Sequence, residues 1–332
     1  MDSEDVKVSI SVVSYNQEKY IRQCLMSLVS QKTNFKYEIV VCDDCSTDGT
    51  GKIISELAGK YPEKIKAHFN RKNLGVTRNG RKASGFCNGK YIACCDGDDF
   101  WCDDERLQRD VDFLEKNPDY IAVCGRTKVV DENGNEIKDG MTGLRVNFWD
   151  FDKPEFNIKD FEAWKMPGHG SAITARNYYL THPEYRKLLT YFSDMVGDRV
   201  GLMFLAINGK IKCTDKLVTC YRFRQSENAE NFMSVYKYKN LKDKDFLMLK
   251  KMEIWCRKKA NIYIDLSSTK KDRLAGAVVI FMKHPSLYNA GVIGRIILYS
   301  GEPLRYIWYV LKTILIKLYY WKIKKQDRTV NL

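Results

Sequence analysis

Residues 37–50 read YEIVVCDDCSTDGT. The stretch begins with a short apolar run rich in β-branched residues, which is typical of a strand buried in a sheet. Asp43 and Asp44 follow almost at once, and Ser46 or Thr47 can then cap a helix. The stretch therefore predicts a strand that ends in acidic side chains and leads into a helix.

The same pattern continues on both sides of this stretch. Strands are predicted at residues 7–14, 65–69 and 90–95, and helices at residues 18–31 and 78–88. The last of these strands closes with the acidic motif DGDD at residues 96–99. Strands that alternate with helices at this spacing indicate an α/β fold, with a Rossmann-like, mostly parallel sheet flanked by helices. Ligands bind such sheets at the carboxyl ends of the strands.

Composition narrows the class of protein. The chain has 332 residues, of which 44% are hydrophobic and 29% charged, so it can bury a core and is not expected to be disordered. A net charge of +13 attracts polyanions such as nucleic acid, anionic lipid or phosphorylated substrates without choosing among them. Eleven scattered cysteines and the lack of a signal-peptide pattern predict reduced thiols in the cytoplasm. Cys42 and Cys45 form one Cys-x-x-Cys pair, which a strand end explains better than a redox or zinc site.

Five acidic residues close two of the predicted strands, namely Asp43, Asp44, Asp96, Asp98 and Asp99. Carboxylates crowded at one edge of a sheet repel one another, and a cation compensates this repulsion. Hard divalent ions such as Mn²⁺ or Mg²⁺ take oxygen ligands of this kind. The alternative is that these acids are solvated caps and turn residues.

The N-terminal hundred residues resemble the family 2 glycosyltransferases, which have the GT-A fold. The likeness covers residues 7–105 closely and residues 160–224 loosely. It rests on the order and spacing of VSYN at 13–16, EIVVCDDCSTDGT at 38–50, NLG at 73–75, TRN at 77–79, and GKYI at 89–92 running into DGDDFW at 96–101. The resemblance implies an enzyme that inverts the anomeric carbon of a sugar taken from a nucleotide-sugar donor.

The resemblance also implies which residues bind the nucleotide. Tyr15 would stack on the base, and Asp43 or Asp44 would hold the base or the ribose. Arg78 would lie near the base or the phosphates, and Asp96 would face the ribose.

In the same likeness Asp98, with Asp99 beside it, would carry Mn²⁺ or Mg²⁺ on the diphosphate. The physical chemistry agrees, because a departing nucleoside diphosphate gains negative charge that a divalent ion offsets. One departure from the family is Cys45, which stands where glycine is usual and can alter the turn.

Transfer also needs a base that takes a proton from the acceptor hydroxyl. In the resemblance Asp198 has that position, with Asp194 as the second candidate. Asp198 could instead be a first-turn residue that the helix dipole favours. His169 matches a stretch near the acceptor site and could donate to the acceptor or a phosphate, or be structural. Arg222 suits a diphosphate, as does Arg224, which stands where the family often has histidine.

Residues 303–325 predict a basic amphipathic helix. One face carries Arg305, Tyr309, Lys312, Thr313, Lys317, Tyr320 and Lys324, and the opposite face carries Leu304, Ile307, Leu311, Ile314, Leu315 and Leu318. Because lysines interrupt the apolar residues, the helix is not expected to span a membrane. It can lie on an anionic membrane surface, or it can pack its apolar face on the catalytic domain.

These patterns predict two regions. A GT-A catalytic domain would span residues 1–230, with nucleotide-sugar binding in 1–105 and the acceptor side in 106–230, where short strands are predicted at 211–213 and 217–221. Residues 231–332 would form a helical, basic C-terminal region.

The leading hypothesis is a metal-dependent hexosyl- or N-acetylhexosaminyltransferase. It would move a sugar from a nucleoside-diphosphate sugar, with UDP the expected nucleotide, to a hydroxyl of a glycan or lipid-linked acceptor. The product would be a cell-envelope polysaccharide or glycolipid, made in the cytoplasm or at the inner face of the cytoplasmic membrane.

Two other functions are weaker candidates. A nucleotidyltransferase acting on sugar phosphates would use a similar sheet, but its glycine-rich phosphate loop is missing after the first predicted strand. A non-enzymatic nucleic-acid binder would explain the positive charge. However, the basic excess is diffuse and C-terminal, so no nucleic-acid partner is expected.

Overall fold

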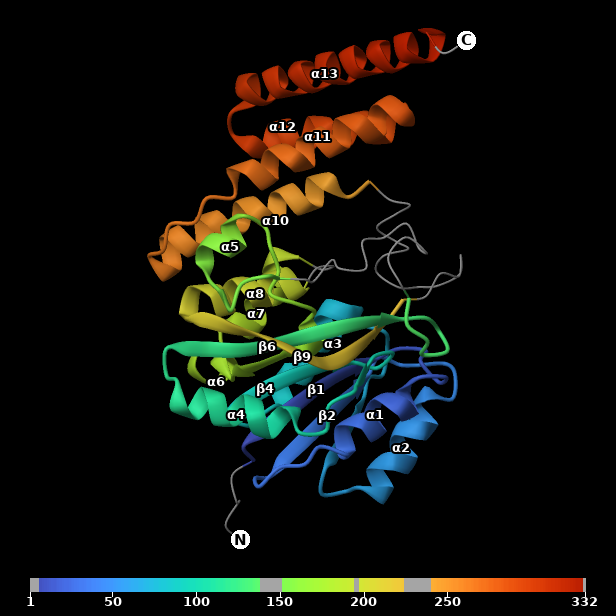
Figure 1. The fold of residues 1–332 in the computed structure, drawn as a ribbon, viewed down its shortest axis with the longest axis vertical. Coiled ribbons are helices and arrows are strands. Elements are labelled where there is room, and N and C mark those ends of the chain that lie inside the picture. Colours follow the sequence, from blue (N-terminus) through green and yellow to red (C-terminus); the bar gives the residue numbers. More distant parts are fainter. Residues whose placement is uncertain (1–5, 138–150, 194–196, 224–239, 331–332) are drawn as a thin grey trace. The chain divides into compact units, whose positions relative to one another are not determined.

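The computed structural model describes residues 6–137, 151–193, 197–223 and 240–330. The chain divides into two compact units. The first comprises Met1–Phe161 and Lys165–Ser226, and the second comprises Glu162–Trp164 and Glu227–Leu332. Figure 1 shows a sheet flanked by helices in the first unit and a set of helices in the second.

The described part of the first unit is built on one nine-stranded sheet, in the order β3-β2-β1-β4-β8-β6-β9-β5, with β7 paired to β9. The strands are β1 (Val8–Ser14), β2 (Tyr37–Asp43), β3 (Ile65–Phe69), β4 (Tyr91–Asp96), β5 (Phe100–Trp101), β6 (Tyr120–Val130), β7 (Glu155–Phe156), β8 (Ile173–Arg176) and β9 (Lys210–Arg222). β1 pairs in parallel with both β2 and β4, and β2 pairs in parallel with β3. This parallel N-terminal half confirms the predicted α/β fold.

Helices cover both faces of this parallel half. The helices of this half are α1 (Ile21–Val29), α2 (Thr50–Lys60), α3 (Val76–Phe86) and α4 (Arg106–Lys116). Later in the chain come α5 (Ile158–Glu162), η1 (Gly170–Ala172), α6 (Tyr178–Thr181), α7 (Tyr185–Phe192) and α8 (Gly197–Asn208). Alternate residues of β1, such as Ile10, share one core with α1 side chains such as Leu25. α3 packs against β1 and β2 from the other side. Burial on both faces explains why these strands are nearly continuous apolar runs.

The outer half of the sheet is mixed and differs from the sequence prediction. β8 lies antiparallel between β4 and β6, and β9 runs parallel to β6. The prediction of two short strands at 211–213 and 217–221 is wrong, because β9 is one strand of 13 residues. Its middle residues, Thr214 to Lys216, are polar and face solvent at least in part, where the register with β6 shifts. A polar, exposed break of this kind looks like a turn in the sequence.

The second unit is helical, as predicted for the C-terminal region. Its helices are α10 (Lys242–Trp255), the π-helix η2 (Cys256–Ala260), α11 (Ser267–Lys283), α12 (Leu287–Ser300) and α13 (Pro303–Val330). Phe246, Leu274, Val292 and Tyr306 meet in its core, one from each of the four long helices. Within the described ranges, no helix is both long enough and apolar enough to cross a membrane.

Candidate active site

The carboxyl ends of β1, β2 and β4 meet at one edge of the parallel sheet. In the strand register Ser14 lies opposite Asp43, and Val13 lies opposite Asp96. The loop after β4 is held in place by a hydrogen bond from Gly97 N to Val13 O at 2.9 Å. The two acidic motifs therefore lie on neighbouring loops, where the sequence predicts a ligand site.

Gly97 allows the loop after β4 to pass close to the turn between β1 and α1. A Cβ atom at this position would lie 2.3 Å from Gln17 Oε1 and 3.1 Å from Ser14 Cβ. Both distances are shorter than ordinary packing contacts. The glycine of the DGDD motif is therefore a packing requirement that sets the position of the aspartates around it.

Asp43 and Asp44 are both buried, and each holds a different loop. Asp43 accepts hydrogen bonds from Ser14 Oγ at 3.2 Å, from Ser46 Oγ at 2.5 Å and from Ser46 N at 3.0 Å. It fixes the turn that leads from β2 into α2.

Asp44 accepts three hydrogen bonds from the segment before α3. The donors are Asn70 Nδ2 at 2.8 Å, Leu74 N at 2.9 Å and Gly75 N at 2.9 Å. A carboxylate offers about four lone-pair positions, so Asp43 and Asp44 each keep about one for a ligand. The contacts leave open which of the two would meet a nucleotide.

Two residues beside these loops have left-handed backbones. Asn16 has a φ of 50°, and its side-chain oxygen accepts from Thr47 N at 2.9 Å, which joins the loop after β1 to the loop after β2. Cys45 has a φ of 64°, a conformation that strains residues other than glycine. The turn at Cys45 thus keeps the conformation that glycine adopts without strain, and the cysteine bears the cost.

Tyr15 and Arg78 lie at the same edge of the sheet. Tyr15 follows β1 directly and is half-buried, and Arg78 is exposed in the first turn of α3. The loop that Asp44 holds leads into that turn. The positions of both residues are compatible with the roles that the sequence predicts for them.

The three aspartates of the DGDD motif have different surroundings. Asp96 is exposed and Asp98 is half-buried, whereas Asp99 is only 1% exposed. The Asp99 carboxylate accepts from Arg222 N and from Ser171 Oγ, both at 2.9 Å. Asp99 therefore anchors the loop after β4 to β9 and η1, while Asp96 and Asp98 remain on the more open side.

Arg222 uses its guanidinium group within the protein. Nε donates to Asp98 O at 2.9 Å, and Nη1 donates to the carbonyl oxygens of Asp131 and Glu132 at 3.1 and 2.8 Å. Nη2 donates to Gln23 Oε1 at 2.8 Å. With these donors engaged, the contacts of Arg222 favour a structural role over the predicted contact with a phosphate. Residue 224, the second predicted arginine, lies outside the described residues.

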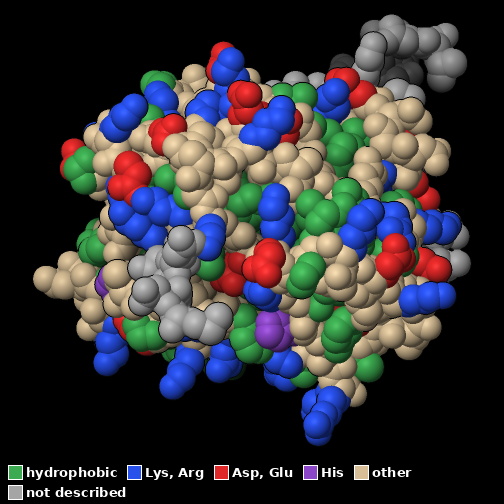
Figure 2. Space-filling model, turned by 90° about the horizontal axis from the view of Figure 1, so that it is seen from below, with side chains coloured by type: hydrophobic (Ala, Val, Ile, Leu, Met, Phe, Trp, Pro, Cys, Tyr) green, Lys and Arg blue, Asp and Glu red, His purple; other side chains and the backbone are tan. Residues whose placement is uncertain are grey.

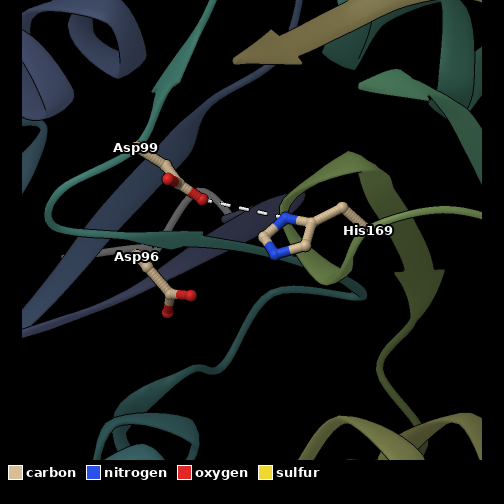
Figure 3. Close-up of side chains that lie close together, drawn as sticks. All are labelled: Asp96, Asp99 and His169. Carbon is tan, nitrogen blue, oxygen red and sulfur yellow. Dashed lines mark ion pairs between the residues drawn. The ribbon is translucent and has the colours of Figure 1, made fainter. Parts of the chain in front are cut away.

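His169 joins the acidic cluster. His169, Asp96 and Asp99 each offer one ligand atom, and these atoms lie within 4.8 Å of one another. Figure 3 shows the three side chains close together, with the Asp99 carboxylate turned toward the His169 ring. His169 Nδ1 lies 3.7 Å from Asp99 Oδ2. His169 Nδ1 also accepts from Ser171 N at 3.3 Å. The sequence places His169 near the acceptor site and does not predict its contact with the acidic residues at the strand ends, because these residues are far apart in the sequence.

This donor set fits a divalent cation. Burial lowers the pKa of His169 to about 4, so the imidazole is neutral near pH 7. Its one ring lone pair accepts from Ser171 N, and a metal bound at Nδ1 would replace that hydrogen bond. Burial raises the pKa of Asp99 well above its ordinary range, and the charges of Asp98 and Asp96 add to the shift. Two oxygen donors and one neutral nitrogen donor suit Mn²⁺, and a bound cation would relieve the crowding of like charges.

Asp96 has a raised pKa although its side chain is partly exposed. It lies deep enough among protein atoms that desolvation raises its pKa to about 7, and the charges of Asp98 and Asp198 contribute further. The acid is therefore poised between its two protonation states near neutral pH, which is common for groups in functional sites.

Asp198 lies in the first turn of α8, and its charge affects the pKa values of residues in this cluster. Its negative charge contributes to the raised pKa of Asp96 and, after burial and the strand-end acids, to that of Tyr221. It also opposes the lowering of the pKa of His169. Asp198 thus lies close to the candidate metal ligands, and its first-turn position also fits the helix-dipole alternative. Asp194 lies outside the described residues.

Tyr221 is a site residue to which the sequence assigns no role. It is half-buried on β9, and the centroid of its ring lies 4.8 Å from that of His169. Its position directly before Arg222, a predicted site residue, is the sequence signal that could have drawn attention to it.

Comparisons with known proteins identify the family of the chain. The family described as Glycosyl transferase family 2 matches residues 9–180, which make up more than half of the chain. An uncharacterised protein of Mycobacterium tuberculosis is 37% identical over 38% of this chain and 37% of its own length. The putative glycosyltransferase EpsE of Bacillus subtilis is 36% identical over 39% of this chain and 45% of its own length. These matches thus span less than half of either relative.

The fold has a solved counterpart. The structure of S. aureus TarS residues 1–349 in complex with UDP-GlcNAc superimposes with a TM-score of 0.60, covering 89% of this chain and 81% of that one at 19% identity. At this identity the likeness concerns the fold, which is of the GT-A type. The motifs, the strand-end acids and the family match lead to one conclusion: the chain belongs to glycosyl transferase family 2.

Proposed function

We propose that the chain is an inverting, metal-dependent glycosyltransferase. It would transfer a sugar from a nucleoside-diphosphate sugar, with UDP as the expected nucleotide, to a hydroxyl of a glycan or lipid-linked acceptor. The observation that carries the proposal is the cluster of Asp96, Asp99 and His169 at the strand ends, with the charge of Asp198 acting on it. A cation site beside a candidate base is what transfer from a diphosphate requires.

In this proposal the loops after β1 and β2 bind the nucleotide. Tyr15 stacks on the base, and Asp43 or Asp44 accepts from the base or the ribose. Arg78, exposed at the start of α3, lies toward the base or the phosphates, and Asp96 faces the ribose. The fixed turns around Asp43 and Asp44 support this assignment, because a binding loop that is already ordered loses little entropy on binding.

Asp98 is the proposed principal ligand of Mn²⁺ or Mg²⁺, with Asp99 beside it. The ligand atoms that lie within 4.8 Å of one another are those of Asp96, Asp99 and His169, and Asp98 is not among them. When bound, the ion would offset the charge that develops on the departing diphosphate. Asp99 holds the loop in place through Ser171 and the backbone of Arg222. The neutral imidazole of His169 adds no positive charge that would repel the cation.

Asp198 is the proposed base. Its carboxylate takes the proton of the acceptor hydroxyl while that oxygen attacks the anomeric carbon from the face opposite the diphosphate. Attack from that face inverts the anomeric configuration. The closeness of Asp198 to the strand-end acids supports this role, because base and leaving group must flank one sugar.

The test is release of nucleoside diphosphate from a panel of nucleotide-sugars with Mn²⁺ or Mg²⁺ present. Asp98→Ala should abolish the release, and Asp198→Asn should keep donor binding but lower transfer by about 10²–10⁴-fold. Asp112→Asn, a change at an exposed acid of α4, serves as the matched control and should leave both unchanged. Unchanged transfer in Asp198→Asn would remove that residue from the mechanism.

Other outcomes would replace the proposal. Release of pyrophosphate from a sugar phosphate and a nucleoside triphosphate would identify a nucleotidyltransferase. Salt-sensitive binding of DNA or RNA without either activity would identify a nucleic-acid binder. Figure 2 gives this last option little support, because basic side chains on the face shown are scattered among acidic and apolar ones.

We further propose that the product is a cell-envelope polysaccharide or glycolipid, made on the cytoplasmic side of the membrane. An acceptor carried on a lipid would require the enzyme to work at a membrane surface. Thin-layer separation of labelled products into lipid and water-soluble fractions would distinguish a lipid-linked acceptor from a free glycan.

A further inference from the structure

α13 packs on the second unit with one side only. Tyr306 is buried in the core, and its ring meets that of Phe246 edge-on at a centroid distance of 5.5 Å. Tyr309 and Val310 are half-buried against the same core, and Thr313 continues this side one turn further on. These four residues of α13 define its packed side, which faces α11 and α12.

The opposite side of α13 is apolar and exposed. Leu304, Trp308, Leu311, Leu315 and Leu318 recur at intervals of four and three residues, which places them on one helical face about 21 Å long. Their exposed fractions are 82% for Leu304, 55% for Trp308 and Leu311, 67% for Leu315 and 48% for Leu318. We refer to these five residues as the α13 stripe. A continuous exposed apolar surface of this kind marks an interaction site.

Positive charge and aromatic rings border the α13 stripe. Lys312 is exposed beside it, whereas Lys317 is exposed on the opposite side of the helix. Tyr319 and Trp321 are 64% and 65% exposed near its end. From residue 303 to residue 321 the sequence has no acidic residue. Apolar side chains, lysines and exposed aromatic rings together match the layered chemistry of an anionic lipid surface.

We propose that the α13 stripe docks on the surface of an anionic lipid bilayer, with the helix lying in the plane of the interface. The leucines and Trp308 would enter the boundary between headgroups and acyl chains, and Lys312, at the border of the stripe, would stay among the lipid phosphates. The two lysines interrupt the apolar sequence, so the chemistry suits a helix lying on the bilayer rather than one crossing it.

A second copy of the chain is a poorer match for the stripe. Basic residues of this terminus are Arg305, Lys312, Lys317, Lys322, Lys324, Lys325 and Arg328, and its acidic residues are Glu302 and Asp327. Two such helices placed side by side would bring like charges together, whereas an anionic bilayer complements them. The proposal rests on α13 alone, so its failure would leave the proposed transferase activity untouched.

The test is flotation of the full-length protein with two kinds of vesicle. One is phosphatidylcholine alone, and the other is phosphatidylcholine mixed with phosphatidylglycerol. The wild type should float with the mixed vesicles, and Leu311→Ser with Leu315→Ser should lower the vesicle association constant at least about tenfold. Lys312→Gln should lower it about fivefold on mixed vesicles and leave any weak binding to neutral vesicles unchanged. Lys317→Gln, on the opposite side of the helix, should lower it less.

Tyr263→Ser is the matched control, because Tyr263 is 74% exposed in the second unit but lies between η2 and α11. It should bind like the wild type, and far-ultraviolet circular dichroism should show every variant folded. Equal vesicle binding by the double leucine variant and the wild type would overturn the proposal, as would absence of wild-type binding to mixed vesicles. A lipid-free dimer that the double leucine variant converts to monomer would also overturn it, and would assign the stripe to a second copy.

Discussion

Asp96 should make the metal-free protein less stable as the pH rises. The pKa of an aspartate in an unfolded chain is about 3.9, whereas that of Asp96 in the folded protein is about 7. Between these values the folded protein holds a proton that the unfolded chain has released. The stability that this proton contributes is fully present below the unfolded pKa and is lost as the pH rises through the folded pKa.

The size of this loss follows from the same two values. The folded pKa lies about two pH units above pH 5. For a fully desolvated group, the free energy of unfolding would fall by about 2.7 kcal/mol over these two units. Because Asp96 is partly exposed, water screens its charge, and we expect a loss nearer to 1 kcal/mol between about pH 5 and about pH 8. Burial also raises the pKa of Asp99, which acts in the same direction, so a substitution is needed to isolate Asp96.

Urea unfolding at the two pH values, with a chelator present, measures the effect. The side chain of Asp96→Asn cannot titrate. Between the two pH values, the free energy of unfolding of this variant should therefore decrease by about 1 kcal/mol less than that of the wild type. Asp112→Asn, at an exposed acid of α4, should keep the wild-type pH dependence. Excess Mn²⁺ should restore wild-type stability at the higher pH, because the cation binds the deprotonated carboxylates. Parallel pH profiles for the wild type and Asp96→Asn would refute the reasoning.

Three further predictions concern the loops of the site. Gly97→Ala should lower the free energy of unfolding by about 1–3 kcal/mol, because the added Cβ would lie 3.1 Å from Ser14 Cβ and 3.0 Å from Ile21 Cδ1 and would displace the Gln17 side chain. Thermal unfolding that matches the wild type would contradict this. Cys45→Gly should stabilise the protein by about 0.5–1 kcal/mol, since it relieves left-handed strain of about 1–2 kcal/mol at some entropic cost, while Cys45→Ala should gain nothing. Either Asp43→Asn or Asp44→Asn, whichever removes the nucleotide contact, should weaken UDP binding about tenfold, measured by calorimetry. If both variants bound UDP with wild-type affinity, neither aspartate would contact the nucleotide.

The N-terminal half of the fold is predictable because its strands β2 and β4, which end in the acidic motifs, are buried along most of their length, whereas β3 is a partly exposed edge strand. Buried strands form short apolar runs that end where the acidic motifs begin, and β3 begins and ends at the predicted residues, Ile65 and Phe69. β9 escapes this reasoning because Asp215 and Lys216 face solvent in the middle of a strand. Its pairing with β6, which is remote in sequence, holds these polar residues in extended form.

The site is predictable in its membership but less so in its contacts. Adjacent aspartates carry the same chemical information in a sequence, so Asp98 and Asp99 cannot be told apart until the hydrogen bonds from Ser171 and Arg222 are known. His169 reaches the acids only through the fold. For α13 the sequence gives the two faces, but the side that packs is set by Tyr306 and its neighbours in the second unit, and the leucines stay outside.

The contacts of Asp99 explain why the three carboxylates of the DGDD motif differ in burial and in hydrogen bonding. A buried acid with a raised pKa costs stability, and it persists where its hydrogen bonds hold together parts that must stay in register. Asp99 joins the loop of the donor half to Ser171 in η1 and to Arg222 in β9. His169 directly precedes η1, and Tyr221 is part of β9. Their rings lie next to each other on the side proposed for the acceptor. In the proposed site, the distance between the candidate metal ligands and the side proposed for the acceptor therefore depends on Asp99, while Asp96 and Asp98 lie on the more open side.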